Sequence, residues 1–191
     1  MREYRTVRSD RRTLALQIRD GELLVRAPRR MSERQIADFV ASHEDWIEKH
    51  LTRAQHASDV VPLTEDELEV LVREAKRVIP ERVAYYAERL GVTYGRVTIR
   101  RQRTRWGSCN AKGDLNFNAL LLLAPPEVLD AIVVHELCHR KQMNHSRAFY
   151  DAVLSAYPTY HTHNLWLKQN GSLLMARLPR KHEEDEDEDE D

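Results

Sequence analysis

The sequence is poor in the features that mark secreted, membrane-spanning and disulfide-stabilised proteins. Its 191 residues include two cysteines, Cys109 and Cys138, too few for a disulfide framework. The longest apolar run, residues 119–124, stops at Pro125, far short of the roughly 20 residues that a membrane helix needs. The arginine-rich N-terminus is followed by no apolar segment typical of a secretory signal. We therefore expect a cytoplasmic protein with no membrane partner.

Aromatic residues are also scarce, at 7% of the chain, whereas charged residues make up 32% and apolar residues 41%. This composition allows a buried core and excludes a wholly disordered chain. The net charge of −1 hides a segregation, because residues 183–191 are nine consecutive acids and the remainder carries 30 basic and 22 acidic residues, a formal +8. We expect residues 179–191 to form a disordered acidic tail, which either solubilises the protein or mimics a polyanion on a basic surface.

Residues 1–60 predict a separate N-terminal region made of a β-hairpin and a helix. Apolar and other residues alternate on both sides of Asp20-Gly21, a pair that supplies the positive φ of a tight hairpin turn. Ser32 and Gln35 then form a capping box at the start of a helical pattern. Because one hairpin is not stable alone, we expect the helix to cover it.

Residues 64–178 predict a core of the α+β class, with helices and a small antiparallel sheet. A second capping box opens at Thr64, and Pro80 is expected to kink or break the long helix that follows. Short strands are expected on either side of a turn at residues 110–114. A further helix is expected to begin at Pro125-Pro126, since proline is tolerated in a first helical turn.

The segment from His135 to His139 reads His-Glu-Leu-Cys-His within that helix. Residues four apart lie on one face of a helix, so both imidazoles can reach one metal ion. Glu136 lies beside them, where it can act as the general base that takes a proton from metal-activated water. A catalytic zinc site needs a third protein ligand, and His145 is the candidate, after a helix end at Asn144. The alternative is that His135 and His139 are partly buried and bonded to backbone carbonyls, and that His145 is a helix-capping polar residue.

A wider set of motifs resembles the YgjP-like metallopeptidases, which are related to the SprT-like and WLM zinc proteases. The residues that carry the resemblance are Arg105-Trp106-Gly107-Ser108-Cys109, Leu115-Asn116, the His135–His139 segment, Asn144-His145-Ser146, Phe149, Tyr157-Pro158 and Trp166-Leu167. The resemblance covers nearly the whole chain except the tail. It implies a gluzincin-like core, a Zn²⁺ ion on His135, His139 and His145, and Glu136 as the base.

Substrate contacts are less well marked by the sequence. Trp106 is either a wall of the cleft or a core residue, and the strand that ends at Asn118 is expected to pair with an extended peptide. Five arginines lie between Arg96 and Arg105 without an intervening acid. We expect Arg103 and Arg105 to contact substrate, since strand alternation would place them with Arg101 on one side. The oxyanion stabiliser stays open among Tyr150, Tyr157, Tyr160, His161 and Arg105.

Three functions follow from these residues. The first is a zinc metallopeptidase acting on peptides or proteins, with another divalent ion possible in place of zinc. The second keeps the same site but hydrolyses nucleoside triphosphates, with the arginines gripping phosphates in the absence of a glycine-rich phosphate loop. The third is a nucleic-acid-binding module with a structural zinc, which would need a fourth protein ligand.

Overall fold

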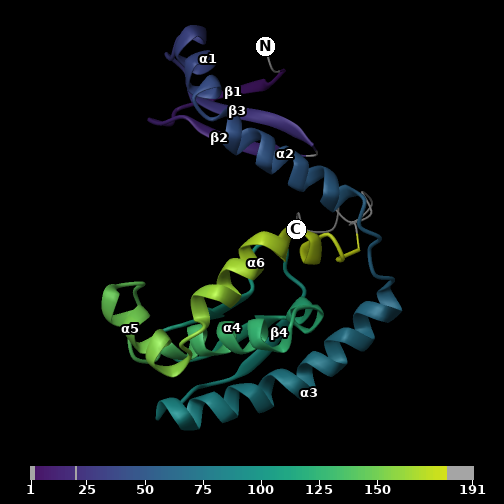
Figure 1. The fold of residues 1–191 in the computed structure, drawn as a ribbon, viewed down its shortest axis with the longest axis vertical. Helices are drawn as coiled ribbons and strands as arrows, with labels where there is room; N and C mark the ends of the chain where they lie inside the picture. The colour runs from purple at the N-terminus through teal and green to yellow at the C-terminus, as the bar shows by residue number, and fades with distance from the viewer. Residues whose placement is uncertain (1–2, 20, 180–191) are drawn as a thin grey trace, which may run out of the picture. The chain divides into compact units, whose positions relative to one another are not determined.

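The computed structural model describes residues 3–19 and 21–179. The chain forms two compact units, Met1–Val60 and Val61–Asp191, each with a buried apolar core of its own (Figure 1). The expected fold class, α+β with helices and small sheets, is confirmed. The expected acidic tail lies outside the described residues except for Pro179. In the described part of the chain, no helix combines the length and the apolar character needed to cross a bilayer.

The N-terminal unit is a three-stranded sheet covered on one face by two helices. Its elements are β1 (Arg5–Ser9), β2 (Ala15–Arg19), β3 (Glu22–Pro28), α1 (Glu33–Ala41) and α2 (Glu44–Ser58). Strands β2 and β3 form the expected antiparallel hairpin. The alternate residues Leu23, Val25 and Ala27 of β3 are buried in one core with Ile36 and Ile47 of the helices. Strand β1 adds to β3 in parallel, which the weak apolar pattern of its sequence did not predict.

The N-terminal helix differs from the expectation because it is divided. The Ser42 hydroxyl donates a hydrogen bond of 2.8 Å to the carbonyl oxygen of Phe39, and a ring nitrogen of His43 lies 2.8 Å from the same oxygen. Side chains that bond to a nearby carbonyl in this way compete with helix continuation. α1 therefore ends at Ala41, and a second helix, α2, runs from Glu44 to Ser58.

The second unit surrounds a mixed three-stranded sheet with helices. Its elements are α3 (Glu65–Leu90), β4 (Val97–Arg100), β5 (Gly107–Cys109), β6 (Leu115–Asn118), the 3₁₀ helix η1 (Ala119–Leu123), α4 (Pro126–Cys138), α5 (Arg147–Ala156) and α6 (Tyr160–Met175). The strand order is β4-β6-β5. β5 and β6 pair antiparallel, but β4 pairs with β6 in parallel, so the sheet is not purely antiparallel as expected. The parallel pair arises because residues 101–106 carry the chain across to the opposite edge of β6.

Pro80 does not break α3, so the break, one of the two outcomes expected at this proline, is wrong. The helix is continuous over 26 residues, and Ile79 and Val83, on either side of the proline, are both fully buried. Proline removes one helical hydrogen bond, a cost of ~3 kcal/mol, which tertiary packing of this kind can offset. The two expected capping boxes, at Ser32 and at Thr64, are both present.

α4 lies at the centre of the second unit, in contact with α3, α5, α6, η1 and β5 (Figure 1). From Val128 to Val134 every residue of the helix is buried. A helix that is apolar on all sides needs partners on all sides, and this explains its central place. The metal-ligand motif identified from the sequence therefore lies on the most constrained element of the unit.

A polar cluster ties α4 to α3 within this apolar surrounding. Asp130 is 6% exposed and accepts a hydrogen bond of 2.7 Å from Nε of Arg82, a second from the same guanidinium, and one of 3.0 Å from the Tyr86 hydroxyl. Burial and the adjacent Asp130 carboxylate raise the pKa of Tyr86, so its hydroxyl keeps its proton and donates. The cluster fixes α4 against α3 one turn before His135.

Replacing Asp130 with alanine is expected to lower the free energy of unfolding by about 2 kcal/mol. This is less than for a fully buried pair because the Arg82 side chain is 40% exposed. Glu81→Ala, which removes a surface ion pair of 3.9 Å with Arg77, should cost much less, because both side chains of that pair are exposed. Urea unfolding of both variants measures the difference, and equal losses would contradict the role given to the cluster.

Candidate metal centre and active-site cleft

The end of α4 and the turn that follows it bring three histidines together. His135 lies in the last turn of α4 and His139 is its C-cap residue. The chain then turns back through residues 140–144, so that His145 lies directly before Ser146, which caps α5 by accepting a hydrogen bond from the backbone N–H of Phe149. The helix thus ends at Cys138, earlier than the end expected at Asn144, and the turn brings the third imidazole next to the first two.

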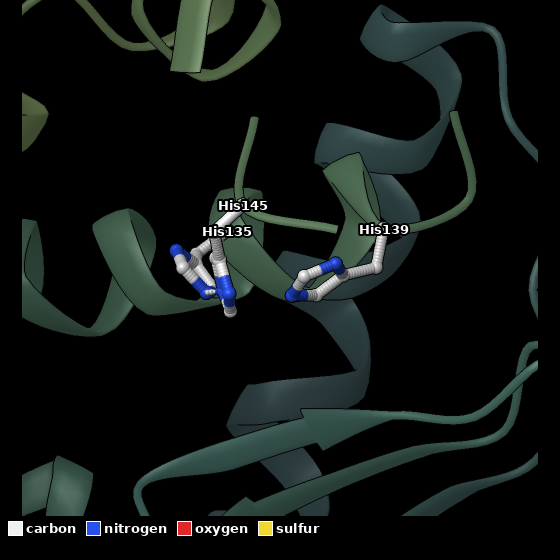
Figure 2. Close-up of side chains that lie close together, drawn as sticks. All are labelled: His135, His139 and His145. Carbon is white, nitrogen blue, oxygen red and sulfur yellow. Dashed lines mark hydrogen bonds between the residues drawn. The ribbon is translucent and has the colours of Figure 1, made fainter. Parts of the chain in front are cut away.

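The three imidazoles converge on one space (Figure 2). One ligand nitrogen from each ring can be chosen so that all three lie within 4.8 Å of one another. Nε2 of His135 and Nε2 of His145 are 3.1 Å apart. Two nitrogens bound at 2.0–2.1 Å to one tetrahedral ion would be separated by about 3.3 Å. The spacing of His135 and His145 and the all-nitrogen donor set therefore fit a divalent ion such as zinc.

Two of the imidazole rings are oriented for metal binding by contacts of their Nδ1 atoms. Nδ1 of His139 lies 3.2 Å from the carbonyl oxygen of Gln142, which can only accept, so Nδ1 carries the proton and Nε2 presents a lone pair. Nδ1 of His135 lies 2.8 Å from the Tyr160 hydroxyl. Burial and the neighbouring histidines lower the pKa of His135 to about 4, and burial lowers the pKa of His139. Both rings are thus neutral at neutral pH, as a metal ligand must be.

Phe149 forms an apolar floor under all three rings. It is fully buried, and its ring centroid lies 4.9 Å from that of His135, 4.6 Å from that of His139 and 5.0 Å from that of His145. The sequence had marked Phe149 only as part of a family resemblance. Its position between residues that are ten apart in the chain required the fold of α5 against α4.

Glu136 lies beside the histidines and packs against the backbone of β5. It is 6% exposed, and burial raises the pKa of its carboxyl to about 8. A Cβ atom on Gly107 would come within 2.6 Å of Oε1 of Glu136 and 2.7 Å of its Cγ. Gly107 is therefore the residue that allows the strand to approach this carboxylate. A cation held by the three histidines would favour the ionised form of Glu136 and so oppose the effect of burial.

A cavity of about 310 Å³ opens beside His135 and Glu136. Its lining residues are Thr104, Arg105, Trp106, Gly107, Ile132, His135, Glu136, Tyr160, Asn164, Leu167 and Lys168. The sequence reasoning singled out neither Asn164 nor Lys168 as a site residue. Tyr160, Asn164 and Lys168 recur every four residues and so share a face of α6, which is the signal that could have grouped them.

Two of the four expected substrate contacts line this cavity. They are Arg105, which is exposed, and Trp106, which is half-buried with its indole 3.1 Å from the position that a Cβ on Gly171 would take. That close approach explains why a glycine stands at position 171, inside α6. Arg103 is outside the cavity lining and donates to the carbonyl of Pro179.

The structure gives Asn118 a structural role. It is fully buried, and its amide nitrogen donates to the carbonyls of Gln102 at 2.6 Å and Arg105 at 3.1 Å, while its oxygen accepts from the Leu120 backbone at 3.1 Å. It therefore holds the loop that carries Arg105 and Trp106. The strand that it ends, β6, is paired on both edges and cannot take a substrate strand, whereas the outer edge of β5 lies at the edge of the sheet.

The arginine cluster does not form the strand face expected from alternation. β4 ends at Arg100, and Arg101 and Arg103 belong to the loop that follows. Nε of Arg100 donates to Oδ1 of Asn116 at 3.3 Å, and Arg101 forms an ion pair of 3.4 Å with Glu65. The cluster is thus dispersed over several partners, and of its members it is Arg105 that reaches the cavity.

Comparisons with known proteins agree with the motifs. A family model described as YgjP-like, metallopeptidase domain, matches residues 12–70 and 64–170. A curated relative from Escherichia coli K12, named UTP pyrophosphatase, is 37% identical over 71 residues. This match covers 35% of the chain and 42% of the relative, so the chain matches less than half of that protein's length.

Two solved structures of metallopeptidase zymogens are also similar: jannalysin from Methanocaldococcus jannaschii and abylysin from Pyrococcus abyssi. Each is 20% identical, has a TM-score of 0.44 and matches 48% of this chain. The matches cover 95% of the jannalysin chain and 94% of the abylysin chain. TM-scores of this size do not establish a shared fold.

Gly107→Ala is expected to reduce hydrolytic turnover by about 100-fold, because the added methyl group displaces Glu136 from its place beside the histidines. Metal content should stay at the wild-type level, since the three atoms nearest to the new methyl group all belong to Glu136 and none to a histidine. Ser108→Ala in the same strand is the matched control, as it removes one hydrogen bond of 3.2 Å from Asn116 without approaching Glu136. Turnover and elemental analysis of both variants check this, and an active Gly107→Ala protein would show that Glu136 tolerates displacement.

Proposed function

The chain belongs to the YgjP-like metallopeptidase family, a family of metal-dependent hydrolases, and from this premise we propose that it is a zinc-dependent peptidase. One observation carries the proposal: three imidazoles converge within 4.8 Å beside a buried carboxylate on the wall of a cavity. In the described part of the chain the cluster consists of three residues. A structural zinc site is closed by four protein ligands, so a cluster of three favours a catalytic site with an open position.

The residues divide the chemistry between them. His135, His139 and His145 would hold the ion, with the first two oriented by Tyr160 and by the carbonyl of Gln142. When bound, zinc supplies a Lewis acid that polarises the scissile carbonyl and lowers the pKa of water. Glu136 takes the proton from the attacking water and delivers it to the leaving amine.

The edge of the sheet supports a peptide as the substrate. β5 is an edge strand, and its Gly107 lies against Glu136. An extended peptide that added to the outer edge of β5 would gain backbone hydrogen bonds and would pass the catalytic carboxylate. The oxyanion that develops needs a donor, for which Tyr157 is poorly placed because its hydroxyl donates to the Glu127 carbonyl at 3.0 Å. Arg105 lines the cavity and is the candidate we favour.

Glu136→Gln is expected to keep wild-type zinc content and to lower turnover of an unfolded protein substrate by at least ~10³-fold, because the amide cannot accept the proton. His145→Ala is expected to lose both zinc and activity, since two protein ligands hold zinc weakly. His163→Ala, which changes a histidine outside the cluster, is the matched control and should alter neither. Elemental analysis and a peptidase assay on the same preparations measure all three. Normal turnover by Glu136→Gln would remove the proposed base.

A second candidate is a nucleoside triphosphate pyrophosphohydrolase that uses the same metal site. Two cationic side chains, Arg105 and Lys168, line the cavity together with His135 and Glu136. Guanidinium and ammonium groups are the usual partners of phosphate oxygens, whereas a peptide bond carries no charge for them to pair with. The name of the curated Escherichia coli relative also denotes pyrophosphate chemistry for that protein.

Lys168→Ala separates the two candidates, because Lys168 lines the cavity but has no part in the proposed peptidase, whereas Arg105 serves in both. If phosphoanhydrides are the substrate, KM for a nucleoside triphosphate should rise by about 100-fold, and elemental analysis should find unchanged zinc. Arg101→Ala, in the loop that carries Arg105 but paired with Glu65 and outside the cavity lining, should leave KM unchanged. Release of pyrophosphate from nucleoside triphosphates and cleavage of unfolded proteins are measured in parallel. Peptide cleavage with no release of pyrophosphate would exclude the second candidate.

A further inference from the structure

A group of arginines in the N-terminal unit lies outside the candidate active site. Arg11 and Arg12 follow β1, and Arg29 and Arg30 follow β3; we call these four residues the arginine patch. The parallel register pairs Ser9 with Pro28, which sets the two loops side by side. Nε of Arg29 donates to Oδ1 of Asp10 at 2.7 Å and ties one loop to the other.

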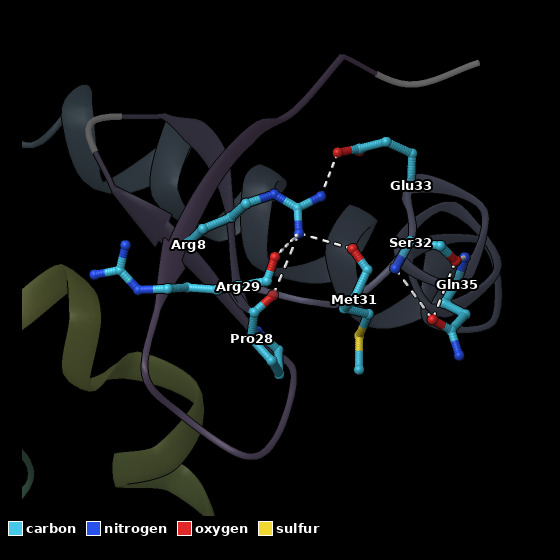
Figure 3. A network of polar contacts seen from close by, with 7 residues as sticks. All are labelled: Arg8, Pro28, Arg29, Met31, Ser32, Glu33 and Gln35. Carbon is cyan, nitrogen blue, oxygen red and sulfur yellow. Dashed lines mark hydrogen bonds and ion pairs between the residues drawn. The ribbon is translucent and has the colours of Figure 1, made fainter.

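A neighbouring arginine holds the second loop in place (Figure 3). Nη1 of Arg8 donates to the carbonyl oxygens of Pro28, Arg29 and Met31 at 3.3, 3.1 and 2.7 Å. Nη2 of the same Arg8 side chain pairs with Glu33 in the first turn of α1. Three carbonyls bound by one guanidinium fix the course of the loop. The patch is therefore presented by an ordered backbone and loses little conformational freedom when it binds.

The charge of the patch is largely uncompensated. The two acids nearest in the chain are already paired, Asp10 with Arg29 and Glu33 with Arg8. Arg12 and Arg30 are exposed, and within the described residues neither has an ion pair. Nε of Arg11 is buried and has no hydrogen-bond partner there. The exposed guanidinium groups of Arg12 and Arg30 therefore have bonding capacity left for an external anion.

Further arginines continue the patch along the uncovered face of the sheet. Val25 and Ala27 of β3 face the helices, so Arg26 between them points to the opposite face, where it is exposed. Arg5 of β1 pairs in register with Leu24, one row along the same face. Rows on one face of a sheet are about 7 Å apart. The basic groups thus form a track instead of a single point.

We propose that the arginine patch binds the phosphodiester backbone of a nucleic-acid strand. All ten basic residues among residues 1–34 are arginines, whose planar fork matches the paired oxygens of a phosphate. The whole chain has a formal charge of −1, so any attraction to a polyanion must come from a local surface of this kind. Contacts to the backbone alone carry no sequence information, so binding should be independent of base sequence and strongly dependent on salt.

Other anionic partners fit the patch less well. In the described part of the N-terminal unit, the one large apolar side chain that is exposed is Trp46, on α2 and not in the patch. A membrane surface would call for apolar residues that enter the lipid interface. A stable protein interface would call for an apolar centre. A basic surface that lacks both the membrane-inserting residues and the apolar centre favours a flexible chain of phosphates as the partner.

Fluorescence anisotropy of the full-length chain with a labelled single strand of about 20 nucleotides tests the proposal. Arg12→Glu with Arg30→Glu is expected to weaken binding at least tenfold at low salt and to flatten the salt dependence. Arg73→Glu with Lys76→Glu, both exposed on α3, makes the same change in net charge and should leave affinity within about twofold. Arg12→Gln with Arg30→Gln gives a milder second variant, and thermal unfolding checks that each protein is folded.

The result of this binding experiment does not depend on the proposed peptidase, because the patch contains no residue of the cavity or the metal cluster. Hydrolytic turnover should therefore be unchanged in the patch variants. Equal losses in the patch and control variants, or no binding by the wild-type chain at low salt, would overturn the proposal. Tighter binding of the chain to poly-glutamate, or to vesicles containing anionic phospholipid, would also overturn the proposal if the patch variants weaken that binding too. Such a result would assign the patch to a protein or a membrane.

Discussion

The candidate active site depends on the burial of α4 on every side. Three helices, a 3₁₀ helix and a strand pack against it, so its axial position and rotation are fixed by contacts with elements distant in the chain. The fixed helix in turn fixes the backbone positions of His135, Glu136 and His139. A metal centre on a mobile surface helix would need its ligands to be ordered anew at each binding event. Here the apolar core performs that ordering, because a packed interior does not deform continuously.

Polar groups buried around α4 have to be hydrogen-bonded, paired with an opposite charge or neutral, and the site shows both kinds of group. Asp130 is held by Arg82 and Tyr86 one turn before the histidines, so its charge is balanced. The buried imidazoles are kept neutral by the lowering of their pKa values, and the Glu136 carboxyl resists ionisation in the absence of a nearby cation. A bound divalent ion would compensate the carboxylate. Metal binding and the ionisation of the base are thus linked by the same electrostatics.

The cavity wall brings two chemistries within reach of one metal centre. On one side, β5 is the edge strand to which the proposed peptide substrate would add. On another, Arg105 and Lys168 offer charges suited to phosphate oxygens. Fold and family do not decide between them, because substrate choice depends on side chains grafted on the same core. The N-terminal unit adds a separate basic surface, built from loops that one arginine holds together.

Local patterns in the sequence determined those features that depend on neighbours along the chain. The hairpin turn, the two capping boxes and the spacing of His135 and His139 on one helical face all follow from contacts within about four residues. Pairings across long distances came only with the tertiary structure: the parallel strands β1 and β4, Phe149 beneath the imidazoles, and Gly107 against Glu136. Tertiary contacts also decided that the Asn118 side chain is buried and that α3 continues through Pro80. Packing energies summed over distant elements outweigh the preference of any single residue.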